Sequence, residues 1–150
     1  MQEIVFQPIG VIHTPHREQA GAPIQPACAD GAKGVVTVFD AYVEALADLA
    51  GFERVWLVYH IDRSAAWQSL VVPYRDSVAR GVFATRAPAR PNPIGLSVVR
   101  LLSVEGNILQ VQEVDMLDGT PLLDIKPYVP EFDAYPDSRT GWLHVSASGR

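Results

Sequence analysis

The sequence predicts a mainly β protein: a small single-domain antiparallel β-barrel with one or two short helices and long loops. Short apolar, β-branched runs recur between turn signals, a pattern typical of all-β sandwiches and barrels. A single segment has helical spacing, so the alternating strands and helices of a doubly wound sheet are not indicated. No G-x-G-x-x-G follows a predicted strand, so nothing favours a Rossmann-type architecture.

The bulk composition agrees with one globular domain. The chain has 150 residues, of which 48% are hydrophobic and 19% charged, as in ordinary globular domains. A formal net charge of -5 disfavours a basic protein that simply coats phosphates. Cys28 is the single cysteine, so no intrachain disulfide can form and a reducing cytoplasm is expected. No apolar run approaches the ~20 residues of a membrane span.

The first half of the chain predicts short strands, a long loop and one helix. Apolar runs at 4–6 and 9–12 are separated by Pro8, and residues 17–34 read as a loop. Val35–Phe39 is β-branched and predicts a strand. Asp40 is a possible helix cap and Gly51 suits the position just after a helix. Helical spacing between them predicts a helix over 40–50, carried by Tyr42, Val43, Leu46, Leu49 and Ala50.

The second half predicts further strands. Val55–Tyr59 is nearly continuously apolar, which favours a strand buried on both faces. Gly106-Asn107 predicts a hairpin, and Asp118-Gly119 predicts a turn. Trp56, Phe83 and Leu101 are expected in the core. Strands or extended segments are predicted at 78–85, 96–104, 108–114, 122–128 and 142–145, with coil at 129–137.

The central stretch from Phe83 to Ser97 is the most unusual part of the chain. It holds two arginines and three prolines. Prolines fix their own φ and push the preceding residue out of the helical region, so Arg90-Pro91-Asn92-Pro93 is extended and stiff. One interpretation is a rigid crossover with solvated arginines. The other is a preformed site for an anionic or planar ligand, because arginine offers a donor fork and a stacking face.

Familiar catalytic motifs are missing. There is no phosphate-binding P-loop, no H-E-x-x-H and no G-x-S-x-G. His13 and His16 alone approach metal-ligand spacing, and no metal site is predicted from them. What remains is a set of polar clusters at predicted strand ends, where barrel proteins form small-ligand sites. Two purely structural interpretations remain open. His60 is then a strand-end histidine whose hydrogen bonds are made within the protein. Asp124 and Lys126 are then a cross-strand ion pair on the surface, which contributes little to stability.

Several long motifs together resemble the TsaA-like (YaeB-like) family, which includes a characterised tRNA methyltransferase. They run from the N-terminus to about Tyr128. The resemblance implies a small β-barrel over residues 1–150, without the additional C-terminal domain of longer members. The matching motifs are Ile9–Pro15, Gly81–Arg86, Arg90–Gly95, Asp118–Pro121 and Asp124–Tyr128.

The resemblance also implies an activity. The cofactor is expected to be S-adenosylmethionine, bound near a homodimer interface. The expected reaction is methylation of N6 of threonylcarbamoyl-adenosine beside the tRNA anticodon. The residues that the resemblance places against the cofactor are Pro23, Ile24, Gln25, His60, Ile61, Arg86, Leu96, Gln112, Glu113, Val114 and Asp115.

Individual roles follow as expectations from this resemblance. Ile61 and Leu96 are expected to sandwich the adenine, Asp115 to accept from a ribose hydroxyl or the amino acid moiety, and Arg86 to hold the cofactor carboxylate. The proton-removing base is left open between Asp124, Tyr128 and His60. RNA contacts are expected from Arg90, Asn92 and Lys126. Two other functions stay open: a cofactor-binding or RNA-binding module without turnover, and a methyltransferase with a small-molecule acceptor.

Overall fold

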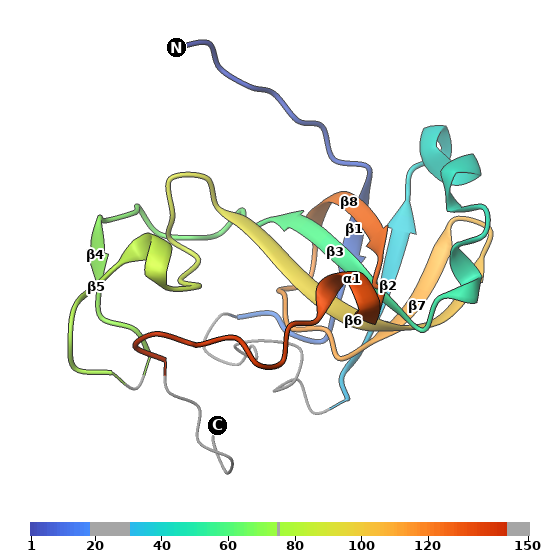
Figure 1. The fold of residues 1–150 in the computed structure, drawn as a ribbon. Coiled ribbons are helices and arrows are strands. Elements are labelled where there is room, and N and C mark those ends of the chain that lie inside the picture. Colours follow the sequence, from blue (N-terminus) through green and yellow to red (C-terminus); the bar gives the residue numbers. More distant parts are fainter. Residues whose placement is uncertain (19–30, 75, 144–150) are drawn as a thin grey trace.

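Six strands close into an antiparallel barrel in the computed structural model, which describes residues 1–18, 31–74 and 76–143. The order around the barrel is β1-β2-β7-β6-β3-β8 (Figure 1). This confirms the predicted mainly β, antiparallel, non-Rossmann fold. The barrel strands are β1 (Gly10–His13), β2 (Lys33–Val38), β3 (Arg54–His60), β6 (Ile94–Glu105), β7 (Ile108–Gln112) and β8 (Thr120–Pro127).

The core fills the inside of the barrel. Every second residue of a strand points inward, and the inward residues are large and aliphatic. Each such side chain contributes on the order of 1.5 to 3 kcal/mol when fully buried. The fully buried core residues, at 0% exposure, are Ile12, Val36, Val55, Leu57, Val99, Leu109, Val111, Val114 and Leu122.

Burial along β3 corrects one prediction. Val55, Leu57 and Tyr59 are buried, but the residues between them are half-buried on the outside. The strand is therefore not buried on both faces, because a closed sheet has only one packed interior. Leu101 lies in the core as expected. Trp56 lies on the outer face.

The predicted turns are present. Glu105 pairs with Ile108, so Gly106 and Asn107 form a two-residue hairpin loop. Gly106 has a φ of 59°, a left-handed conformation that glycine adopts without a steric penalty. Gly119 has a φ of 82° in the predicted turn before β8.

The predicted helix is replaced by two 3₁₀ segments, η3 (Asp40–Leu46) and η4 (Leu49–Gly51). Asp40 does not cap; it is the first helical residue, and Phe39 at the N-cap makes no side-chain capping bond. Asp48 takes a left-handed φ of 68° and interrupts the helix. Short helices depend on tertiary packing, and Leu46 is the one buried residue in these two segments.

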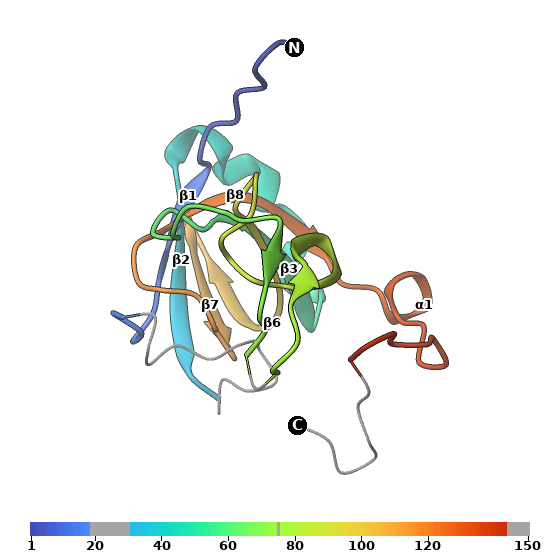
Figure 2. The same ribbon diagram turned by 90° about the vertical axis from the view of Figure 1, so that its left-hand side faces the viewer.

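Residues 62–93 leave the barrel as an arm (Figures 1 and 2). The arm contains β4 (Leu70–Val71), β5 (Arg80–Gly81) and the 3₁₀ turn η5 (Val82–Ala84). The strand predicted over 78–85 is therefore mostly wrong, because the chain turns after Gly81. Phe83 is 79% exposed rather than in the core.

The C-terminal segment runs back from the barrel to the arm. A short helix, α1 (Pro130–Asp133), occupies part of the predicted coil, with proline in its first turn. Its Asp133 accepts from the Trp56 indole at 3.3 Å. Trp142, expected in a strand, instead donates to the Ala84 carbonyl at 2.8 Å; residues 144 and 145 lie outside the described residues. None of the helices in the described segments is long and apolar enough to cross a membrane.

Candidate active site at one end of the barrel

Part of the predicted site lies at the end of the barrel where β1, β3 and β7 end and β2, β6 and β8 begin. The register pairs His60, the last residue of β3, with Ile94, the first of β6. The Ile61 amide then donates to the Pro93 carbonyl at 2.7 Å. These contacts place His60 and Ile61 beside the first residues of β6. Leu96 lies two residues beyond Ile94, where it pairs with Val58, and Ile61 packs against the core.

A β-bulge follows β7 at this end. The amides of Glu113 and Val114 both donate to the Ala32 carbonyl, at 2.7 and 3.2 Å. Glu113 has a φ of 71°, the left-handed conformation that usually requires glycine in such a bulge. Two residues therefore oppose one, and the side-chain alternation of β7 shifts. Val114 enters the core at 0% exposure, and Asp115 turns toward β6.

The Asp115 carboxylate is the last acceptor in a series of hydrogen bonds that includes the hydroxyls of Tyr59 and Ser97. Ser97 Oγ donates to Asp115 Oδ1 at 2.7 Å, and the Tyr59 hydroxyl lies 2.8 Å from Ser97 Oγ. Since Ser97 gives its one proton to the carboxylate, Tyr59 donates to Ser97. Burial raises the pKa of the Asp115 carboxyl to about 6, although the bond from Ser97 acts in the opposite direction. Burial likewise raises the pKa of Tyr59.

The neighbouring carboxylate, Glu113, is already engaged. Arg54 binds it with both terminal nitrogens, at 2.9 and 3.2 Å. The hydrogen bond to Glu113 raises the pKa of Arg54 above its usual value. The side chain of Gln112 also bonds within the protein, donating to the Gly31 carbonyl at 3.2 Å. In the Gln112–Asp115 segment, the groups left for a ligand are therefore the backbone groups and the Asp115 carboxyl.

The loop from Thr85 to Pro93 is held by its own side chains. Arg90 Nη1 donates to the carbonyls of Thr85 and Ala87, at 2.8 and 3.1 Å. The Ala87 amide donates to Thr85 Oγ1 at 3.2 Å. As expected, residues 90–93 lie in neither a helix nor a strand. Arg90 therefore stiffens the loop, whereas Arg86 is exposed and its guanidinium makes no hydrogen bond or ion pair within the described segments.

Of the two predicted catalytic residues, Asp124 lies within β8 and Tyr128 lies just beyond its end. Asp124 pairs with Val58, which pairs with Leu96, so these three share one row on the outer face. Adjacent strands are ~4.8 Å apart, which places Asp124 roughly 10 Å from Leu96. Tyr128 lies further along, where its ring contacts Trp56 edge-on with centroids 5.7 Å apart. The structure groups Asp124, but not Tyr128, with Leu96.

The predicted Asp124–Lys126 ion pair is present, with Nζ 3.2 Å from Oδ2. Both residues lie on β8, so the pair runs along one strand rather than across two. Asn92, the third predicted RNA contact, is exposed in the loop before β6. Pro23, Ile24 and Gln25 lie outside the described residues.

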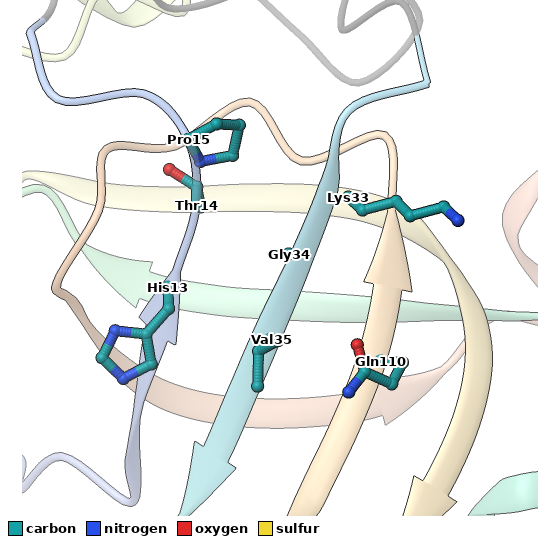
Figure 3. A pocket seen from close by; sticks show the side chains of 7 residues that line it. All are labelled: His13, Thr14, Pro15, Lys33, Gly34, Val35 and Gln110. Carbon is teal, nitrogen blue, oxygen red and sulfur yellow. The ribbon is translucent and has the colours of Figure 1, made fainter.

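The two histidines near the end of β1, His13 and His16, each contact a nearby group of the protein. His13 Nδ1 lies 3.5 Å from Asp118, and His16 Nε2 lies 2.9 Å from the Val114 carbonyl oxygen. A hollow of about 270 Å³ beside His13 is mostly apolar. Figure 3 shows the His13 and Lys33 side chains pointing away from one another, so their charges do not converge on a ligand. No cluster of three potential metal ligands occurs in the part of the chain that the structure describes.

The sequence patterns did not predict three residues that contact the bulged segment or support its carboxyl: Tyr59, Ser97 and Arg54. Tyr59 and Ser97 sit in apolar strand runs, where the sequence signal is that of core residues. Arg54 precedes a strand and resembles any solvated charge. Their roles depend on cross-strand register, which single-sequence patterns leave open.

Comparison with known proteins identifies the family of this chain. Residues 11–134 match the family model described as the tRNA-methyltransferase O N-terminal domain. The chain belongs to this family. A probable S-adenosyl-L-methionine-binding protein of Pyrococcus abyssi is 54% identical over 140 residues, covering 93% of this chain and 76% of that protein. The tRNA (adenine(37)-N6)-methyltransferase of Escherichia coli is 36% identical over 152 residues, covering 95% and 65%.

Solved structures of family members have the same fold. TrmO from Pseudomonas aeruginosa superposes with a TM-score of 0.80 at 40% identity, covering 93% of this chain and 62% of that one. A second TrmO structure gives a TM-score of 0.82 and covers 97% of this chain and 66% of that one. This chain therefore spans a little under two thirds of the TrmO chains that it matches.

Proposed function

We propose that this protein is an S-adenosylmethionine-dependent methyltransferase that methylates N6 of an adenosine in tRNA. The observation that carries the proposal is the barrel end itself. There the bulged segment Gln112–Asp115 brings its buried carboxyl to Ser97 of β6. His60 pairs with Ile94 of the same strand, and Leu96 lies two residues further along it. The proposal treats residues 1–150 as one barrel domain that supplies both the cofactor and the acceptor site.

The residues at this end suit the chemistry of S-adenosylmethionine. The cofactor has an apolar adenine, ribose hydroxyls, a carboxylate and two cationic groups. Ile61 and the 60% exposed Leu96 offer apolar surface for the adenine. Asp115 supplies a carboxyl for a hydroxyl or a cation, and the exposed Arg86 supplies a fork for the carboxylate. His60, Gln112 and Val114 complete the described part of the proposed site, together with the backbone of Glu113, whose carboxylate binds Arg54. Pro23, Ile24 and Gln25, from residues 19–30, belong to the same proposal.

When bound, the cofactor supplies an electrophilic methyl group on a positively charged sulfur. The main task of the protein is then to position the donor and the acceptor. The proposed acceptor nitrogen, in threonylcarbamoyl-adenosine, belongs to a urea, whose proton is more acidic than that of a simple exocyclic amine. A modest base therefore suffices. We assign that role to Asp124, since it lies in the row of Leu96, with Tyr128 and His60 as the other candidates.

The RNA contacts proposed are Arg90, Asn92 and Lys126. Arg90 acts within the loop through its two carbonyl bonds, so it contributes to acceptor binding by fixing the loop shape. Asn92 and Lys126 are exposed and are available for direct contacts to phosphate or base edges.

Titration calorimetry with S-adenosylmethionine tests the cofactor. We expect saturable binding that the variant Arg86→Ala weakens and the variant Arg90→Ala leaves intact, while Arg90→Ala impairs tRNA methylation. Absence of saturation at millimolar cofactor would reject the proposal. Equal loss of cofactor affinity in both variants would reject the division of labour between the two arginines.

A homodimer with the cofactor near its interface is part of the proposal. The outer face of β6 exposes Ile94 at 45%, and Ile94 pairs with the proposed cofactor residue His60. Apolar side chains at this exposure favour a partner surface. Light scattering is expected to give twice the monomer mass, and Ile94→Asp is expected to give a monomer. We place the protein in the cytoplasm with its tRNA substrate.

A second function is a module that binds the cofactor or RNA without turnover. The net charge of -5 favours the form that binds the cofactor alone, because an acidic protein repels polyanionic tRNA. Methyl transfer to tRNA that lacks only this modification would exclude it. A small-molecule acceptor is the third possibility. Nucleoside analysis of tRNA from a deletion strain separates that case, since unchanged anticodon-loop nucleosides would favour it.

A further inference from the structure

Glu113 has a backbone conformation that its residue type disfavours. Within the described segments, Glu113 and Asp48 are the two non-glycine residues with positive φ. Such a φ brings Cβ close to a carbonyl oxygen, so it persists only where other contacts hold it. Asp48 lies in a surface turn between two 3₁₀ segments. Glu113 instead opens the bulge that leads to Asp115, the carboxyl of the proposed cofactor site.

A contact that holds Glu113 is visible. The Arg54 side chain extends from the start of β3 across β6, and its guanidinium grips both Glu113 carboxylate oxygens. The same guanidinium reaches the Val98 carbonyl of β6 at 3.5 Å. Both side chains are about three quarters buried, with 28% and 25% exposed. A two-bond fork restricts the carboxylate in direction as well as distance, so it restrains the backbone of Glu113.

The bulge decides where the next two residues point. If Glu113 returned to an ordinary strand conformation, the alternation of β7 would continue and the directions of Val114 and Asp115 would change. In the observed bulge Val114 packs in the core, and Asp115 meets Ser97 at 2.7 Å. The direction of the Asp115 carboxyl therefore depends on the conformation of Glu113.

We propose that Arg54 is a positioning residue for the cofactor: by binding Glu113 it holds the bulge that presents Asp115 and the neighbouring backbone. This inference rests on the proposed function, and it gives Glu113 a backbone role, with its side chain directed to Arg54 instead of the ligand. Glycine at position 113 adopts the left-handed conformation without assistance, so it should make Arg54 dispensable.

The test is calorimetry with S-adenosylmethionine on matched variants. Glu113→Ala removes the carboxylate and keeps Cβ, and we expect its dissociation constant to rise about tenfold, the ratio that corresponds to a left-handed penalty of this kind. Arg54→Ala is expected to give a similar rise. Glu113→Gly, alone or combined with Arg54→Ala, is expected to stay within about twofold of the wild type. Arg100→Ala is the control, because Arg100 pairs with Arg54 across the sheet but forms no ion pair within the described residues.

Two results would overturn the inference. One is wild-type affinity in Glu113→Ala and Arg54→Ala. The other is an equal loss in Glu113→Gly and Glu113→Ala, which would show that the carboxylate itself serves the cofactor. Thermal unfolding of each variant identifies affinity losses that come from global destabilisation. If the wild type shows no saturable binding, the proposed function fails and this inference fails with it, whereas failure of the inference alone leaves wild-type binding intact.

Discussion

Asp115 shows how a single residue links the fold to the proposed chemistry. Its carboxyl is buried beside Ser97, whose hydroxyl donates to it at 2.7 Å, and the groups nearby include His16 and Tyr59. Hydrogen bonds from Ser97 and from the backbone offset only part of the cost of burying this charge, so the pKa stays raised, at about 6. A cationic or hydroxyl-bearing ligand at this carboxyl would offset more of that cost.

Asp115→Asn is expected to stabilise the free protein at neutral pH. The native pKa of about 6 lies above the unfolded value near 3.9, so the native state holds the proton more tightly. The resulting stabilisation is complete below pH 4 and is lost as the pH rises through 6. The loss amounts to an order of 2 to 3 kcal/mol, and asparagine avoids it.

Denaturant unfolding between pH 4 and 8 measures this effect. The free energy of unfolding of the wild type should fall over that range more steeply than that of Asp115→Asn. Parallel profiles of the two proteins would show that Asp115 is solvated and not buried.

Gly95 predicts a second effect at the residue scale. A Cβ at this position would overlap with Cε2 of the Tyr59 ring. Gly95→Ala must therefore displace Tyr59 and break its bond to Ser97, which we expect to cost about 2 to 3 kcal/mol of stability. Gly81→Ala is the matched control, since no atom lies within 4 Å of a Cβ there. Equal unfolding midpoints for the two variants would contradict the packing described.

Among the elements, the loop from Thr85 to Pro93 follows the sequence in part. The prolines predict a segment that is neither helix nor strand, as observed, but residues 90–92 form bends instead of an extended segment. Arg90 supplies donors that hold the loop. Arg90→Ala removes two bonds to carbonyls and is expected to cost about 1 kcal/mol. Hydrogen exchange should show faster exchange at the Ala87 amide, with no change at the β3 amides. Unchanged exchange at Ala87 would mean that Arg90 does not hold the loop.

The strands were more predictable than the helix and the arm. Runs of β-branched residues between turn residues predict β2, β3, β6 and β7. The hairpin that joins β6 to β7 depends on the local turn sequence Gly106-Asn107. The segment 40–51 has helical spacing but few buried contacts, so it forms 3₁₀ turns. In the arm, β4 and β5 are two residues each, too short to leave a periodic signal.

At the scale of the whole molecule, barrel closure assembles the site. The motif resemblance indicated His60, Leu96 and Asp115 as neighbours of one cofactor, and the register places His60 and Asp115 on either side of the first residues of β6. Register also determines what the patterns missed: the Tyr59–Ser97–Asp115 chain and the reach of Arg54 to Glu113. Those contacts join residues at least 18 positions apart, beyond any local signal.

The arm and the C-terminal segment form a second region, in which Trp142 joins the C-terminal segment to the arm. Its indole donates to Ala84, and the Arg80 guanidinium lies 4.9 Å from its ring centroid. The arm carries exposed apolar side chains that suit a partner surface. They include Trp67, Leu70, Tyr74 and Phe83.

Methyl transfer in a purified system is the decisive test of the proposed tRNA methyltransferase activity. The protein is incubated with S-adenosylmethionine and with tRNA from cells that lack this one methyl group, and the digested nucleosides are examined by mass spectrometry. We predict that the wild-type protein adds one methyl group to N6 of the modified adenosine beside the anticodon. The variant Asp124→Asn is expected to add none. Cofactor binding without any methylated nucleoside would contradict the proposal.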